Sequence, residues 1–142
     1  MSNQLTQNYN TAKIFVWDNR YQVEAIANSG YAAVTLEKGT VMARLTASGK
    51  LVPFIASALL DGSAAPIGVL TEEHTIEAGD EINVNICIAG DVVAPMLVFA
   101  NGTDTLETVI TYLNKNVKDA LQSLSVAIKL VDSTELSNFD NQ

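Results

Sequence analysis

The side chains that could carry out nucleophilic or acid–base chemistry are few in this sequence. It contains one histidine, His74, which follows Glu72 and Glu73, and one cysteine, Cys87. A histidine beside carboxylates can act as a general base, and a cysteine can act as a nucleophile when its pKa is depressed. Cys87, however, lies within an apolar segment that contains no cation. We therefore predict that His74 is a solvated loop residue and that Cys87 is a packed, unreactive residue.

The sequence does not indicate a metal, nucleotide or phosphate site either. A single histidine and a single cysteine cannot supply the ligand spacing of a zinc site. Asp80, Glu81 and Asp91 could meet near one turn, but they do not follow the calcium-loop pattern, and we interpret them as solvated turn acids. The sequence also has no glycine-rich phosphate loop. We therefore predict no cofactor, no metal and no catalytic residue, and hence no enzyme.

The charge of the chain is acidic and unevenly distributed. The chain has 8 lysines and arginines against 16 aspartates and glutamates, which gives a formal net charge of −8. No lysine or arginine occurs from Leu51 through Asn114. A surface built from this segment repels phosphate groups, which argues against a nucleic-acid partner. We interpret these acids as turn residues that keep the protein soluble. The alternative is that this face stays solvated while a different, less charged face makes contacts.

Length and hydropathy predict one soluble domain with a short arm. A chain of 142 residues can bury a substantial core. No apolar run approaches the roughly 18 residues of a membrane helix, and no export signal opens the sequence. We therefore expect no membrane partner and synthesis in a reducing cytosol. With one cysteine, the chain cannot form an intramolecular disulfide.

Short strands separated by glycine-containing turns are predicted between residues 36 and 99. Residues 81–89 alternate strictly between apolar and polar side chains, which predicts a strand with one buried face. That face would contain Ile82, Val84, Ile86 and Ile88. Further strands are predicted over residues 41–45, 50–54 and 66–70, and one more precedes this region, over residues 21–26. Several short strands at this spacing are typical of a compact β barrel or sandwich.

The apolar spacing changes after residue 99. Apolar residues recur at helical intervals, and Asp104 stands three residues before Glu107, as in a capping box. The polar residues 114–116 interrupt this pattern, which therefore fits one helix over about residues 104–124 or two shorter helices. Residues 125–131 alternate again and predict a closing strand, and residues 132–142 form a polar tail.

The N-terminal segment differs from the rest of the chain. Residues 1–11 are rich in amides and offer Leu5 and Tyr9 for burial, too little to offset the entropy of ordering, which predicts a flexible arm. A β-prone cluster follows in residues 14–17. Two interpretations stay open from the residues alone: a frayed terminus, or an arm that folds when it pairs with the sheet edge of a partner.

The order and spacing of these turns and strands resemble the lambda-type bacteriophage head decoration proteins. Residues 39–54 are similar to the opening hairpin of that family, and residues 61–70 to its Asp-Gly loop and following strand. Residues 82–95 resemble its late strand and glycine turn, and residues 119–131 its closing helix and strand. The similarity extends from about residue 36 to residue 131; the preceding segment matches only in being an arm.

This resemblance implies a fold and a function. The fold is mainly β with a C-terminal helix (α+β), a small β-clip- or barrel-like domain with a flexible N-terminal arm. Residues 1–35 would form the arm and leading strands, residues 36–131 the decoration domain and residues 132–142 the tail. The implied function is capsid decoration: homotrimers bind the major capsid protein at local threefold positions outside the mature head and stabilise the shell against internal DNA pressure.

Within this interpretation, the arm is the predicted capsid-binding site. The expected contact residues are Leu5, Tyr9, Ile14, Phe15, Val16 and Trp17. The protein would lie on the outer surface of the virion head after synthesis in the host cytoplasm.

Two other function classes stay open. A carbohydrate-binding or adhesin-type virion surface module would use exposed aromatic side chains, but aromatic residues make up only 6% of this chain. A small β-clip enzyme, such as a nucleotide hydrolase, would need a clustered acid, base and phosphate-binding group. The absence of lysine and arginine from residues 51–114 argues against a phosphate substrate.

Overall fold

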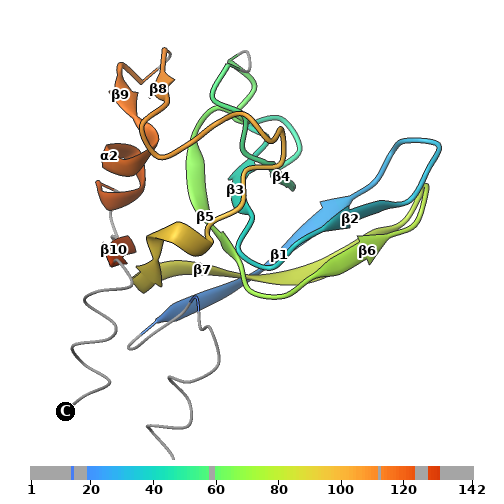
Figure 1. Cartoon of the computed structure of the whole chain (residues 1–142). Coiled ribbons are helices and arrows are strands. Elements are labelled where there is room, and N and C mark those ends of the chain that lie inside the picture. The colour runs from blue at the N-terminus through green and yellow to red at the C-terminus, as the bar shows by residue number, and fades with distance from the viewer. Residues whose placement is uncertain (1–13, 15–18, 58–59, 112, 124–127, 132–142) are drawn as a thin grey trace, which may run out of the picture.

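The computed structural model describes residues 14, 19–57, 60–111, 113–123 and 128–131 (Figure 1). Its strands are β1 (Arg20–Ala27), β2 (Val34–Leu36), β3 (Val41–Arg44), β4 (Leu51–Pro53), β5 (Pro66–Leu70), β6 (His74–Ile76), β7 (Glu81–Val93), β8 (Val109–Ile110), β9 (Lys115–Asn116) and β10 (Ile128–Val131). A 3-10 helix, η1 (Ala94–Met96), follows β7, and α2 (Val117–Gln122) precedes β10. The described part of the chain is thus mainly β with one short C-terminal α-helix, as the sequence predicts. No helix in these ranges is long and apolar enough to cross a membrane.

Five of the strands in the described ranges close into a small barrel. Their hydrogen-bonded order is β1-β4-β3-β5-β7, and β7 pairs again with β1. The pairings are antiparallel except between β1 and β4, which meet in parallel at Ile26 and Leu51. β10 lies parallel to the end of β7, outside the ring. The predicted barrel-like domain is therefore confirmed.

β7 has 13 residues and changes character along its length. In its first half Val84 and Ile86 are buried while Asn83 and Asn85 are exposed, as the alternation predicts. The flanking Ile82 and Ile88 are partly buried and pack against the same core. From Ile86 onward both faces of the strand are covered, because Cys87 is buried as well.

The described side chains form two buried apolar clusters, one on each side of the sheet. One includes Met42, Leu51, Leu70 and Ile86, together with Ile26 of β1. The other includes Phe54, Val92, Ile110, Leu121 and Ile128 and joins the barrel to α2 and β10. The C-terminal elements are too short to be stable by themselves, so packing against the barrel stabilises them.

β2 and β6 form an antiparallel ribbon that extends away from the barrel, at the right of Figure 1. Leu36 and Ile76 are both buried, so alternate residues of each strand anchor the ribbon while the others face solvent. His74 begins β6, opposite Leu36, and is half-buried. The prediction of a solvated loop histidine is therefore wrong, because pairing of β6 with β2 makes His74 part of a strand.

The predicted helix over residues 104–124 is wrong for its first half. β8 and β9 form a short hairpin there, and α2 begins only at Val117. Asn114 has a positive φ of 52°, which is incompatible with a right-handed helix interior. Asn116 then caps α2, because its side-chain oxygen accepts a hydrogen bond from the Asp119 N–H at 2.8 Å. The helical apolar spacing instead places Ile110, Val117 and Leu121 in one buried cluster.

The other predicted strands are confirmed within the described residues. The hairpin of β3 and β4 surrounds the Ser48-Gly49 turn, and β5 and β1 coincide with predicted strands. β10 confirms the closing strand over residues 128–131. Apart from Ile14, the predicted arm in residues 1–13 and 15–18 and the tail in residues 132–142 lie outside the described residues.

Candidate functional site

Cys87 is a structural thiol. Its side chain is 0% exposed, accepts a hydrogen bond from the Asn19 side-chain amide at 3.3 Å and donates one to the Ala89 carbonyl oxygen at 3.2 Å. Burial raises the pKa of the Cys87 thiol, so the group stays protonated near neutral pH. A buried, protonated thiol is a poor nucleophile. The prediction of a packed residue is confirmed.

The acidic residues of the described chain do not assemble into a metal site. No three histidine, cysteine, aspartate or glutamate side chains in the described ranges come together as metal ligands. Glu81 forms an ion pair with Lys50 at the start of β7. Asp91 lies near the other end of the same strand, where its backbone is in register with Lys129 of β10. Asp80 and Glu81 are therefore separated from Asp91 by most of β7.

Two further carboxylates accept hydrogen bonds that stabilise loops. The Asp104 carboxylate accepts a hydrogen bond from the Ala56 N–H at 2.8 Å, across 48 residues of sequence. The Asp61 carboxylate accepts hydrogen bonds from the hydroxyl and the N–H of Ser63, which lower the pKa of Asp61. The Asp104 contact has no local sequence signal, because its partner lies in a distant loop.

β1 offers an edge that is only partly paired. It pairs with β7 along its whole length but with β4 only at Ile26. Tyr21 and Val23 lie on this strand with 49% and 65% of their surface exposed. Glu24 is held in an ion pair with Arg44 at 2.7 Å, which fixes the strand against β3. Exposed apolar side chains on a strand edge are typical of a contact surface.

Two adjoining hollows lie between the β2–β6 ribbon and the barrel in the described part of the chain. The larger, of about 510 Å³, includes Glu37, Glu73 and Phe99 in its walls. The smaller, of about 160 Å³, is lined mainly by apolar residues such as Ile26 and Ile76. Both hollows share Val34, Leu36 and Pro53. We call the joined hollow the ribbon groove.

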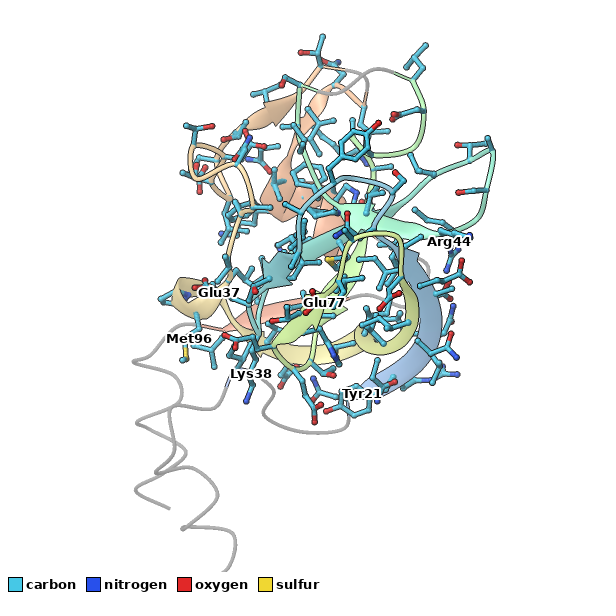
Figure 2. All side chains as sticks on the ribbon, turned by 90° about the vertical axis from the view of Figure 1, so that its right-hand side faces the viewer. Tyr21, Glu37, Lys38, Arg44, Glu77 and Met96 are labelled. Atoms are coloured by element: carbon cyan, nitrogen blue, oxygen red, sulfur yellow. The ribbon has the colours of Figure 1, made fainter. Side chains whose placement is uncertain are left out.

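The ribbon groove combines an apolar floor with acidic walls. Leu36 is buried in the floor, whereas 42% of the Val34 side chain is exposed. Glu37 and Glu73 are exposed and contribute negative charge to the larger hollow. In Figure 2 Glu37, Lys38 and Met96 appear on one side of the molecule, with Arg44 on the opposite side. The groove thus presents an apolar floor and two carboxylates to solvent.

Ile14 is the one predicted contact residue that the structure describes. Its side chain is 4% exposed and belongs to the buried core, and its carbonyl oxygen accepts a hydrogen bond from the Val93 N–H at 2.8 Å. Ile14 therefore anchors the N-terminal segment to the domain. The other predicted contact residues lie outside the described residues: Leu5, Tyr9, Phe15, Val16 and Trp17.

One family model matches most of the chain. It is described as "Bacteriophage lambda head decoration protein D", and it matches residues 5–114. The match covers the N-terminal segment that the resemblance in the sequence did not reach, and it ends before α2. No curated protein matches the chain.

Proposed function

The chain belongs to the family of the bacteriophage lambda head decoration protein D, and on that premise we propose that it is a cement protein on the outer surface of the mature phage head. Homotrimers at the local threefold positions bridge neighbouring copies of the major capsid protein. The added contacts stabilise the shell against the pressure of the packaged DNA. The match of the family model over residues 5–114 carries this proposal.

The chemistry of the described residues supports a structural, non-enzymatic role. The one cysteine is buried and protonated, the Asp61 and Asp104 carboxylates hold loops, and Glu24 and Glu81 form ion pairs. A cement protein needs no reactive group, because many weak contacts repeated by the symmetry of the shell act together through avidity. The net charge of −8 also fits a protein that keeps away from the genome and takes no nucleic-acid partner.

The N-terminal arm is the proposed capsid contact. Ile14 fixes the arm to the barrel, and Leu5, Tyr9, Phe15, Val16 and Trp17 supply apolar side chains on both sides of that anchor. An arm that adds a strand to a capsid sheet would gain main-chain hydrogen bonds without a specific polar residue. In this proposal the protein is made in the host cytoplasm and joins the head afterwards.

Electron microscopy of purified virions tests the trimeric arrangement. We expect threefold-symmetric density outside the shell at the local threefold positions. Isolated monomers, or dimers on twofold axes, would contradict the proposal. A second measurement heats decorated and undecorated particles and records the temperature of DNA release, which should be higher for the decorated particles.

A further inference from the structure

We propose that residues 1–13 dock in the ribbon groove of their own subunit while the protein is free in solution. This docking does not depend on the proposed capsid function. Its consequence for assembly does depend on that function: an arm held in the groove is released when it engages the capsid.

The point of attachment places the arm beside the groove. The Cδ1 atom of Ile14 lies 2.9 Å from the position that a Cβ on Gly39 would occupy. Gly39 is next to Thr40, which lines the larger hollow, and its carbonyl oxygen accepts a hydrogen bond from the N–H of Val98, another lining residue, at 2.9 Å. An extended chain spans roughly 3.3 Å per residue, so 13 residues are ample to cover the groove. A short tether also gives an effective concentration on the order of millimolar.

Charge selects the N-terminal segment over the C-terminal one. Residues 1–13 contain Lys13 and no acidic residue, whereas residues 132–142 contain three acids and no base. The walls of the larger hollow include Glu37 and Glu73, with one further acid, Glu72, and one base, Lys38, next to them in sequence, so the acids are in excess. These carboxylates attract the N-terminal segment and repel the C-terminal one.

The arm carries two apolar residues that can share one face, and the groove has two hollows. Leu5 and Tyr9 are four residues apart, so in an extended chain both side chains project from the same face, roughly 13 Å apart. Val34 lines both hollows, so the two apolar side chains of the arm could each occupy one of them. The ring of Phe99 is fixed in the larger hollow by an edge-on contact with the buried Phe54, with ring centroids 6.3 Å apart. Docking would cover Val34, which is otherwise 42% exposed.

Paramagnetic relaxation in the full-length protein tests the docking. A spin label is attached to a Ser2→Cys variant; unsubstituted protein treated with the label controls for Cys87, which is buried and should not react. We expect the amide signals of residues 34–37 and 98–100 to lose most of their intensity, while those of the β8–β9 hairpin keep theirs. Unchanged signals at residues 34–37 and 98–100 would overturn the proposal.

Matched variants identify the contacts. The double substitution Leu5→Ser and Tyr9→Ser should abolish the intensity loss, because it removes both apolar side chains. The control, Gln4→Ser and Asn8→Ser, changes the opposite face of an extended arm and should preserve the loss. Glu37→Gln with Glu73→Gln should weaken it, as should added salt. If the control pair had the same effect as the apolar pair, docking by these side chains would be refuted.

A mixed sample separates docking within a subunit from exchange between subunits. Isotope-labelled protein without a spin label is combined with spin-labelled protein that carries no isotope. Docking within one subunit leaves the signals of the mixed sample unchanged, whereas signal loss there would assign the groove to a neighbour's arm and contradict the proposal. Capsid attachment is measured separately: if the apolar double variant loses docking but attaches normally, docking stands and the proposed capsid contact of the arm fails.

Discussion

Gly39 lies where three separate segments of the chain meet. Its φ is +92°, and a Cβ there would stand 2.7 Å from the Met96 carbonyl oxygen and 2.9 Å from the Ile14 side chain. Its N–H also donates a hydrogen bond to the Leu70 carbonyl oxygen at 2.8 Å. Since the Met96 contact is with backbone, it cannot be relieved by a change of rotamer. Only glycine fits this position without moving the anchor of the arm.

Substitution of Gly39 by alanine should therefore cost more stability than the same change at Gly49. Both residues have positive φ, for which alanine costs about 1–2 kcal/mol, but no heavy atom lies within 4 Å of a Cβ placed on Gly49. The clash at Gly39 should add a further ~1–3 kcal/mol. Urea unfolding of the two variants measures the difference. Equal costs would show that the contacts around Gly39 are not tight.

The buried thiol predicts a dependence of stability on pH. Burial raises the pKa of Cys87 in the folded protein, whereas an unfolded cysteine ionises near pH 8.5. Below that pH both states keep the proton, and the stabilisation is fully present. As pH rises toward the folded pKa, only the unfolded state loses the proton, so the free energy of unfolding falls.

Comparison with a Cys87→Ser variant isolates this effect. The serine hydroxyl does not ionise in this range, so the stability advantage of the unsubstituted protein should shrink between about pH 8 and pH 10 and stay constant between about pH 6 and pH 7. At neutral pH the variant itself should cost about 1–2 kcal/mol, because it buries a more polar group. Urea unfolding at each pH gives the values, and a constant difference throughout would argue against a buried thiol.

At the level of elements, local patterns predict strands better than they predict the segment around α2. The alternation around β7 and the glycine turn between β3 and β4 act locally, so both elements follow from the sequence. Apolar residues between positions 104 and 116 also recur at helical spacing, but this segment forms no helix. Its Ile110 is buried by packing against distant parts of the chain. The Asp104 side chain, which fits a helix start, is instead bound to the Ala56 N–H. Tertiary contacts therefore override the local preference.

The N-cap of α2 provides a direct test of where that helix begins. Asn116→Ala removes the side-chain oxygen that accepts the Asp119 N–H and should lower the free energy of unfolding by about 1 kcal/mol. Asn116→Ser keeps an acceptor and should cost much less. Circular dichroism with urea unfolding measures both variants. If serine were as destabilising as alanine, the start of α2 would lie elsewhere.

On the scale of the whole molecule, the strands of the barrel can be predicted from the sequence, whereas the candidate site cannot. The barrel follows from strand spacing, but its closure by β1 and β7 requires pairing between distant segments. The sequence does not predict the ribbon groove, because its walls come from β1, β2, β4, β6 and the segment after η1, which no local pattern brings together. The burial of Ile14 likewise depends on Gly39 and the core, not on the neighbours of Ile14 in sequence.

Deletion of Met1–Thr11 should weaken attachment to the capsid and leave a folded domain. The core begins at Ile14, so the truncated chain should still unfold in one cooperative urea transition, at a urea concentration lowered by no more than the docking of the arm contributes, while binding capsids more weakly. Attachment is measured by titrating undecorated capsids with each protein. The urea transition is the control: the Leu5→Ser and Tyr9→Ser variant, which removes docking alone, should show the same small shift, and a larger shift in the truncated chain would mean that its weaker binding comes from a damaged fold. Saturation of capsids with unchanged affinity would show that the arm is not the capsid contact.

The pairing of β1 with β7 determines when the barrel can close during translation. Arg20 pairs with Ala89 and Ala27 with Glu81, so β1 has no partner on that side until β7 has left the ribosome. At roughly 5–20 residues per second, this delay lasts several seconds. During that time the nascent chain carries an open strand edge with Val23 beside it, which is a site for wrong pairing with other chains. The yield of soluble protein should therefore depend on how soon β7 becomes available to β1.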